Sequence, residues 1–275
     1  MIELPEAITL SKQLNDTING KIISKVIAAH TKQKLTWYYG NPQKYQNLLH
    51  HKKIDNTNAF GGFIEISAQN MKILFRDGVH LRFFEDQSKL PEKHQLLLEF
   101  KDQSVLIAFV QMYGGVGCFI QNDLNNTYYT IAKEKPSPLS KEFNENYFYP
   151  LIQNDDVQKL SLKAFLATEQ RIPGLGNGVL QDILFNAKLH PKEKIKSLSQ
   201  QQTQELFKSI KKTLTDMVHN NGRDTERDLF GCPGEYRTKM CKNTVGKRCD
   251  VCNSTIMRSN YLGGSIYFCP TCQKL

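Results

Sequence analysis

The sequence predicts a multidomain α+β protein with an N-terminal helix and antiparallel β-sandwich, then a helical domain, then a zinc-ribbon β-hairpin. Three observations predict it. Short alternating apolar runs fill residues 21–131, helical spacing follows residue 156, and four of the seven cysteines lie in the last 27 residues. A chain of 275 residues is long enough to form two domains, each with its own core. The expected divisions are 1–131, a linker at 132–156, a helical domain at 157–235 and a zinc finger at 236–275.

The first elements are a helix over residues 5–18 and a series of strands after it. Apolar residues recur in the helix at near-helical spacing, and Pro5 suits a first helical turn. From residue 21 the pattern changes to short runs such as KIISKVIAA, GGFIEISA and SVLIAFVQ, separated by Gly, Asp, Asn and Lys. A series of such runs without a long helical insert predicts a sandwich or barrel.

The second half of the chain has a helical pattern. Residues 132–156 contain prolines and polar runs such as KEKPSPLS, which are typical of a linker. Three segments then have apolar residues at helical spacing: LSLKAFLATEQ, NGVLQDILFNAKL and residues 199–220. Ser197 and Ser199 are the candidate N-caps of the last helix.

The tail predicts one metal site. Its cysteines follow the spacing C-x2-C, sixteen residues, C-x2-C, and they are Cys249, Cys252, Cys269 and Cys272. Four thiolates complete a tetrahedral shell with no open position, so we expect one structural Zn²⁺ that supplies the folding energy of the hairpin. Four free or redox cysteines are the competing interpretation. Cys118, Cys232 and Cys241 lack such pairing, and we expect plain thiols there.

Charge and targeting patterns narrow the class of partner. The net charge of +9 suits a polyanion, which is either nucleic acid or an acidic membrane surface. No run of about eighteen apolar residues exists, and MIELPEAITL lacks the features of a signal peptide. We therefore expect a cytoplasmic protein with reduced thiols, in which clustered cysteines bind metal rather than form disulfides.

A glycine-containing turn, IPGLGNGVL at 172–180, lies between two predicted helices. Gly174 and Gly176 bracket the turn, and Asn177 opens the next helix. Such a turn can direct backbone N–H groups outward at a helix N-terminus, where a phosphate binds. A helical hairpin that binds nothing is the alternative.

Three segments together resemble the formamidopyrimidine-DNA glycosylase and endonuclease VIII family of base-excision repair enzymes. They are MIELPEA at the start, PGLGNGVL…ILFNAKLHP at 173–191, and the ribbon ending in YFCPTCQ. The resemblance covers the whole chain and implies a helix–two-turn–helix motif at 173–191 and a DNA-binding zinc finger. It also implies double-stranded DNA with damaged bases or abasic sites as partner, phosphate contacts at Asn177, Gly174 and Gly176, no membrane, and a monomer.

At the N-terminus, this sequence departs from the catalytic residues of the family. In most members Met1 is removed, and an N-terminal proline attacks C1′ of a nucleotide extruded between the domains, beside a glutamate that handles protons. Here Glu3 is that glutamate, but Ile2 holds the proline position. Methionine is trimmed before small residues, so we expect Met1 to be retained, with its amine one residue further from Glu3. The alternative for Glu3 is a purely structural role in the first turn of its helix.

Other family positions are also replaced. The resemblance places the family's hairpin lysine at Gly62, its finger arginine at Gly264 and a histidine at Leu74. Glycine cannot neutralise a phosphate, so each such loss removes a contact worth about 1.5–3 kcal/mol. The arginines considered as replacements are Arg76, Arg82 and Arg258.

Two further segments are candidates for DNA contact. Met112 and Tyr113 suit the wedge that fills the gap left by a flipped base, with plain hairpin-loop residues as the alternative. The polar stretch 220–239 corresponds to a loop that closes on that base in the family. Arg223 and Arg227 in it either contact DNA or form a salt-bridged surface turn.

These observations predict a base-excision repair glycosylase whose AP lyase step is weakened or lost, with Glu3 activating water and Ile2 and Met1 at the nucleophile position. A catalytically inactive protein that binds damaged DNA is the alternative. Membrane-surface binding is disfavoured, because no basic amphipathic helix stands out.

Overall fold

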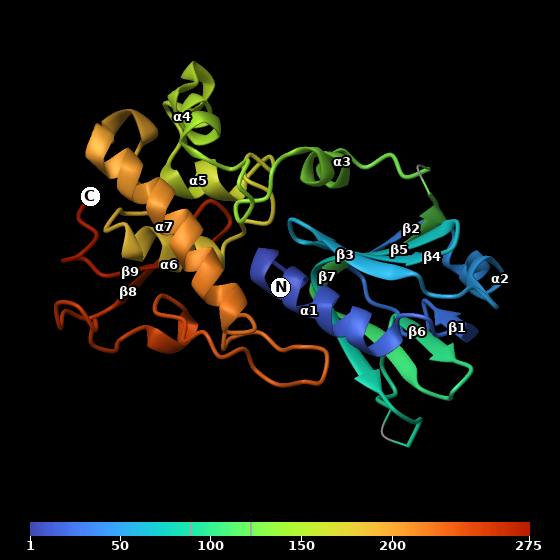
Figure 1. The fold of residues 1–275 in the computed structure, drawn as a ribbon. Helices are drawn as coiled ribbons and strands as arrows, with labels where there is room; N and C mark the ends of the chain where they lie inside the picture. Colours follow the sequence, from blue (N-terminus) through green and yellow to red (C-terminus); the bar gives the residue numbers. More distant parts are fainter. Residues whose placement is uncertain (89, 122) are drawn as a thin grey trace.

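The computed structural model describes residues 1–88, 90–121 and 123–275, and its ribbon has a sheet lobe and a helical lobe (Figure 1). A two-stranded ribbon ends the chain beside the helices. This arrangement confirms the α+β class that the sequence predicts. No helix in the described part of the chain is long and apolar enough to cross a membrane.

Helix α1 (Leu4–Ile18) connects the two lobes. It begins at the predicted place, and its buried residues Leu10, Leu14 and Ile18 recur every four positions, which gives one apolar stripe. The helix packs against β3, β4 and α7. Leu4 belongs to the core of the helical lobe, whereas Leu14 belongs to the core of the sheet lobe. The first residues of the chain therefore lie where the two lobes meet.

The sheet lobe contains one seven-stranded sheet. Its strands are β1 (Ile23–Ala28), β2 (Thr36–Tyr39), β3 (Asn56–Phe60), β4 (Phe63–Ala68), β5 (Met71–Phe84), β6 (Leu96–Phe100) and β7 (Val105–Ile120). The order is β1-β6-β7-β5-β4-β3, and these pairs are antiparallel. The short strand β2 pairs parallel with β7, which the sequence pattern did not predict. A short helix, α2 (Tyr45–Leu49), packs against β1.

A bulge interrupts the pairing of the two longest strands. Asp77 pairs with Gly114 and Val79 pairs with Val110, so residues 111–113 of β7 lie opposite Gly78 alone. A Cβ atom at Gly78 would lie 2.4 Å from the carbonyl oxygen of Tyr113, so the bulge needs glycine there. The predicted wedge segment is therefore a bulge within a strand and not a hairpin loop.

The helical lobe contains α4 (Glu145–Gln153), α5 (Leu162–Ala167), α6 (Val179–Asn186) and α7 (Gln200–His219), whereas α3 (Thr127–Glu134) packs on the sheet lobe through Tyr129 and Ala132. Ser199 caps α7 as predicted, because its Oγ accepts the amide of Gln202 at 3.1 Å. The expectation of a plain linker over 132–156 needs correction, since Phe143 and Phe148 are buried in the helical core. Aromatic residues drive this segment into the lobe despite its polar neighbours. The predicted domain boundaries themselves stay predictions.

The C-terminal ribbon consists of β8 (Met257–Tyr261) and β9 (Gly264–Phe268). It is the hairpin that the sequence predicts, with Leu262 and Gly263 at the turn. Phe185 of α6 packs into the cysteine cluster of the ribbon. Asn177, in the glycine-containing turn, donates to the carbonyl of Ser265 at 3.0 Å, which places the start of β9 beside that turn.

A candidate nucleic-acid interface between the lobes

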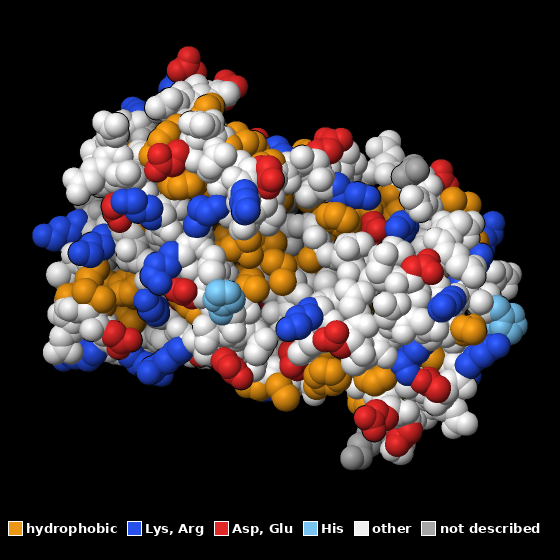
Figure 2. Space-filling view, viewed as in Figure 1, with side chains coloured by type: hydrophobic (Ala, Val, Ile, Leu, Met, Phe, Trp, Pro, Cys, Tyr) orange, Lys and Arg blue, Asp and Glu red, His pale blue; other side chains and the backbone are white. Residues whose placement is uncertain are grey.

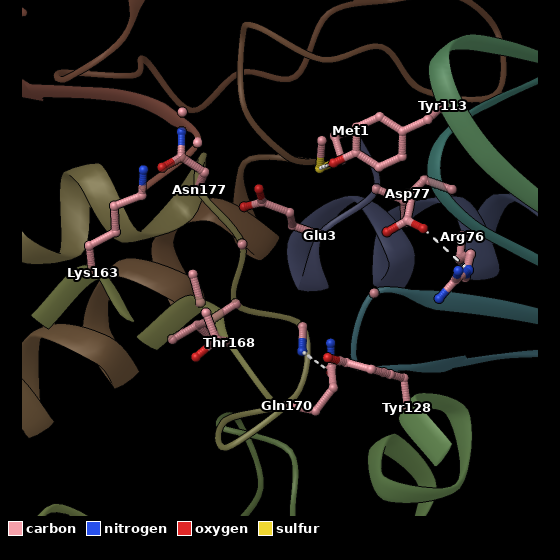
Figure 3. Close-up of a pocket in the computed structure, with 18 of the residues that line it drawn as sticks. Met1, Glu3, Arg76, Asp77, Tyr113, Tyr128, Lys163, Thr168, Gln170 and Asn177 are labelled. Carbon is pink, nitrogen blue, oxygen red and sulfur yellow. Dashed lines mark hydrogen bonds and ion pairs between the residues drawn. The ribbon is translucent and has the colours of Figure 1, made fainter. Parts of the chain in front are cut away.

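A cleft of about 690 Å³ separates the sheet lobe from the helical lobe (Figure 3). The N-terminal residues, the β3–β4 turn, β5 and β7 line one side. Helices α3 and α5, the glycine-containing turn and the turn of the ribbon line the remainder. The cleft therefore brings together the N-terminal residues, the ribbon turn and the segments that carry most of the predicted site residues.

The carboxylate of Glu3 lies between the two sides of the cleft (Figure 3). Its Oε1 accepts the amide of Gly178 at 2.8 Å, and its Oε2 accepts the amide of Val179 at 2.7 Å. These amides form the N-terminus of α6, which attracts an anion. Glu3 thus caps a helix of the other lobe. It occupies two of the N–H groups that the turn was expected to offer to a phosphate.

The glycines of this turn leave room for charged side chains. A Cβ atom at Gly176 would lie 2.5 Å from Oε1 of Glu3, and one at Gly178 would lie 1.6 Å from Nη1 of Arg223. Gly174 is buried, and its carbonyl accepts the amide of Leu4 at 2.9 Å. The turn is therefore shaped around groups of the protein itself.

Arg223 faces inward, although the polar loop around it suggested contact with DNA or an exposed turn. Its side chain is 3% exposed. Its Nε and Nη2 donate to the two carboxylate oxygens of Glu6 at 2.9 and 2.7 Å, and its Nη1 lies 3.4 Å from Oε2 of Glu3. Arg227 is exposed and donates to the carbonyl of Gly231 at 2.9 Å. Arg223 is thus the counter-ion of two buried carboxylates.

Two carboxyl groups with perturbed acidity line the cleft. Burial raises the pKa of Glu3 above its usual 4.5, and the positive charge of Arg223 opposes that rise. Burial likewise raises the pKa of Asp77, whose Oδ2 pairs with Nε of Arg76 at 3.2 Å. Sequence reasoning missed Asp77, because the partner residues that form its bulge are distant in the chain.

On the helical side, Asn177 and Lys163 lie next to the ribbon. The amide of Asn177 donates to the carbonyl of Ser265 at 3.0 Å, and Nζ of Lys163 donates to the carbonyl of Tyr261 at 2.5 Å. A Cβ atom at Gly264 would lie 3.3 Å from Nζ of Lys163. Lys163 is 5% exposed, and burial lowers its pKa. No carboxylate among the described residues forms an ion pair with it.

Sequence reasoning missed Lys163, because a lysine in a short helical segment is usually solvated.

Of the three arginines considered as replacements, Arg76 lines the cleft. Arg82 donates instead to the carbonyl of Asp228 at 2.8 Å, and Arg258 donates to Oγ of Ser265 at 3.0 Å. Over the helical half of the face seen in Figure 2, Lys and Arg side chains are spread between acidic ones.

The bulge of β7 presents apolar and aromatic groups at the mouth of the cleft. Met112 is 75% exposed, and the hydroxyl of Tyr113 lies 3.7 Å from Sδ of Met1. The ring of Trp37 meets that of Tyr113 edge to face, with the ring centroids 6.0 Å apart. Trp37 is the sole tryptophan of the chain and is 46% exposed, yet the sequence pattern did not single it out.

The N-terminal residues are held by hydrogen bonds and an ion pair. The amide of Ile2 donates to the carbonyl of Asp77 at 2.7 Å, so its nitrogen is an ordinary buried peptide nitrogen. The α-ammonium of Met1 pairs with Oε2 of Glu226 at 2.5 Å. With Met1 present, the chain has no secondary amine at the position that Ile2 occupies.

The four cysteines of the ribbon have the geometry of a metal site. Their sulfur atoms all lie within 4.8 Å of one another. Sulfurs bound tetrahedrally at about 2.3 Å from a zinc ion lie about 3.8 Å apart. The observed Sγ–Sγ distances are 3.9 Å for Cys249 and Cys272 and 3.3 Å for Cys252 and Cys269. The donor set therefore fits one metal ion.

Comparison with known proteins agrees with this architecture. The family described as "Formamidopyrimidine-DNA glycosylase H2TH domain" matches residues 135–228. The formamidopyrimidine-DNA glycosylase of Legionella pneumophila (strain Paris) is 28% identical over 284 residues, covering 100% of this chain and 99% of that protein. That of Prochlorococcus marinus (strain MIT 9301) is 26% identical over 298 residues, with 100% of both chains covered.

Solved structures have the same fold. The Fpg of Lactococcus lactis in complex with DNA that contains an abasic site superposes with a TM-score of 0.84 at 21% identity, covering 99% of this chain and 100% of that one. The MutM (Fpg) protein of Thermus thermophilus gives 0.80 at 20% identity, with 98% of each chain covered. The H2TH match over residues 135–228, the full-length relatives and the four-cysteine ribbon together support membership of the formamidopyrimidine-DNA glycosylase and endonuclease VIII family.

Proposed function

We propose that the protein is a DNA N-glycosylase that removes damaged, oxidised bases from double-stranded DNA, with its AP lyase step weakened or lost. The observation that carries the proposal is the Glu3 carboxylate, held at the cleft between the lobes by the N-terminus of α6. The names of the full-length relatives support the same class of activity.

In the proposed reaction the damaged nucleotide turns out of the duplex into the cleft, because C1′ is shielded within the stack. Glu3 takes a proton from a water molecule, whose oxygen forms a bond to C1′ as the bond from C1′ to the base nitrogen breaks. The released base takes up a proton, and the DNA keeps an abasic site. This route needs no amine, which agrees with the buried amide of Ile2 at the nucleophile position.

Binding of the DNA backbone is proposed for the helical side of the cleft. Lys163 lies beside Gly264, where the family's finger arginine falls, and supplies a cation next to Asn177. Arg76 offers a second positive charge on the sheet side. The exposed Met112 and the adjacent Tyr113 suit insertion into the gap left by the flipped base. Arg227, Gly174 and Gly176 stay predicted DNA contacts.

For the ribbon we propose one structural Zn²⁺ bound by Cys249, Cys252, Cys269 and Cys272. The ion would supply the folding energy that so small a hairpin lacks and so keep the ribbon turn at the cleft. Four cysteines leave no open coordination position, so the ion takes no part in base removal. A monomer in the cytoplasm remains the expected state.

A panel of lesion duplexes tests the activity. Purified protein is incubated with duplexes containing oxidised pyrimidines, formamidopyrimidine, 8-oxoguanine or an abasic site, and strand breaks are measured with and without hot alkali. We expect alkali-dependent breaks at one or more damaged bases and few direct breaks. Preferential binding of damaged duplexes without base release would instead favour the alternative, a catalytically inactive protein that binds damaged DNA. Equal affinity for intact and damaged duplexes, with no base release, would exclude both functions.

A further inference from the structure

The α-ammonium of Met1 has a specific partner in the loop after α7. It lies 2.5 Å from Oε2 of Glu226, whose side chain is 21% exposed. The carbonyl of the same Met1 accepts a hydrogen bond from Nη2 of Arg223 at 3.4 Å. Both polar groups of the first residue are therefore bound by residues from one loop more than two hundred positions away in the chain.

The loop that binds Met1 is itself firmly attached. Arg223 is anchored by two hydrogen bonds to Glu6, and Nη2 of Arg223 lies 4.0 Å from Oε1 of Glu226. The amide of Glu226 donates to the carbonyl of Arg223 at 3.0 Å, which closes a tight turn. Glu226 is thus held at a fixed place relative to the start of α1, so its carboxylate can fix the direction of the N-terminal amine.

That direction leads away from the cleft. Glu226 is absent from the described residues that line the cleft, and it borders a smaller hollow together with His80 and Arg227. Burial, the positive N-terminus and Arg82 lower the pKa of His80 to about 4. The same N-terminal charge opposes the rise in the pKa of Asp77 at the cleft. The side chain of Met1, by contrast, points to Tyr113 at the cleft (Figure 3).

We propose that Glu226 and Arg223 form a clamp that holds the retained Met1 with its α-ammonium turned out of the cleft, which prevents the N-terminal amine from attacking C1′. The clamp deepens the proposed function and rests on it, because it gives a structural cause for the loss of the lyase step. Glu226 is a positioning residue in this scheme. Its neutral amide analogue lacks the charge and would hold the ammonium less tightly, so the amine could turn toward the cleft more often.

Borohydride trapping on DNA with an abasic site tests the clamp. An attacking amine forms a bond to C1′ of the open aldehyde, water leaves, and hydride from the added borohydride reduces the iminium to a stable amine. We compare the unchanged protein, Glu226→Gln and Glu235→Gln, which removes an exposed carboxylate of the same loop. The expected result is about tenfold more adduct for Glu226→Gln, the factor that corresponds to losing one contact of about 1.4 kcal/mol.

The adduct should map to the α-nitrogen of Met1 by peptide mass, and Glu235→Gln should match the unchanged protein. Equal or lower trapping by Glu226→Gln overturns the clamp, as does an intact mass showing that Met1 is absent. If the variant no longer binds the abasic duplex, the rate of reductive methylation of Met1 by formaldehyde and cyanoborohydride decides instead, and it must rise. Base release from damaged duplexes is measured on the same proteins, so failure of the glycosylase proposal stays distinguishable from failure of the clamp.

Discussion

The guanidinium of Arg223 lies 3.4 Å from the carboxylate of Glu3, and both side chains are almost fully buried. Arg223 comes from the loop after α7, Glu3 precedes α1, and the carboxylate rests on the first amides of α6. A charge buried among so few polar groups depends on its counter-ion. The pair therefore couples the acidity of the candidate catalytic group to the position of a distant loop.

Replacing Arg223 with Gln should destabilise the protein strongly. The change leaves Glu3 and Glu6 as two buried carboxylates without a cation, and breaking a buried pair in this way costs about 3–5 kcal/mol. Urea unfolding at neutral pH measures the loss. Arg227→Gln, an exposed arginine of the same loop, serves as the control and should change stability little. A loss no larger than that of the control would contradict the role assigned to Arg223.

The same variant should shift the pH dependence of base release. Burial already raises the pKa of Glu3 above 4.5, and the Arg223 charge restrains that rise. Without the cation the pKa of Glu3 rises further, so the acidic limb of the rate profile moves to higher pH. The stability loss should shrink as pH falls through that range, because protonated carboxyl groups need no counter-ion. A rate profile with an unchanged acidic limb would exclude Glu3 as the titrating group.

Removing the metal should abolish DNA binding but leave the sheet folded. The ribbon owes its folding energy to the ion, whereas the sheet lobe has its own buried core. The measurements are metal content, which should be one zinc per chain, and duplex binding before and after a strong chelator. Cys232→Ser, an exposed cysteine outside the cluster, should keep the metal. Full DNA affinity in the metal-free protein would contradict the proposed role of the ribbon.

Lys163→Met should weaken DNA binding and its dependence on salt. The variant keeps most of the side-chain volume but removes the cation beside Asn177 and Gly264. Losing one charge-assisted phosphate contact costs about 1.5–3 kcal/mol, and the logarithmic salt slope should fall by about 1. The control is Lys196→Met, an exposed lysine that lies outside the cleft. Equal salt slopes for the two variants would show that Lys163 does not meet the backbone.

Trp37 offers an optical test of where DNA binds. As the sole tryptophan, half-exposed and 6.0 Å from the ring of Tyr113, it should change its emission when a duplex enters the cleft. A fluorescence titration should show a larger change with an abasic duplex than with an intact one. Met112→Ala should reduce that difference, because the wedge that stabilises the gap is lost. An unaltered emission at saturating DNA would place the duplex elsewhere.

Local patterns predicted the parts of this protein that depend on neighbours in sequence. The helix over 5–18, the Ser199 cap and the four-cysteine hairpin follow from spacing and residue type, and the structure contains them. The segment 132–156 shows the limit of composition, because a few aromatic residues place α4 in the core in spite of polar surroundings. Strand β2 was missed for a related reason, since its parallel partner lies far along the chain.

The candidate site depends on contacts between distant segments, which a single sequence does not reveal. Glu3 was predicted at the site, but not that it would cap α6 of the other lobe. Arg223 was predicted to face DNA or solvent, because nothing near it in sequence indicates Glu6 as its partner. Asp77 and Lys163 were missed. Asp77 lines the cleft because of the bulge between β5 and β7, and Lys163 does so beside the ribbon turn, and neither arrangement is visible in the local sequence.

Single-turnover base release tests whether Glu3, and not Asp77, is the catalytic carboxyl group of the cleft. On the best substrate of the lesion panel, Glu3→Gln and Asp77→Asn are measured beside the unchanged protein. Asparagine suits the positive φ of 59° at position 77, so the second variant should fold normally. We expect Glu3→Gln to lower the rate by about 10²-fold or more, and Asp77→Asn to release base at a rate similar to that of the unchanged protein. Unchanged base release by Glu3→Gln would contradict the role of Glu3 as the catalytic base.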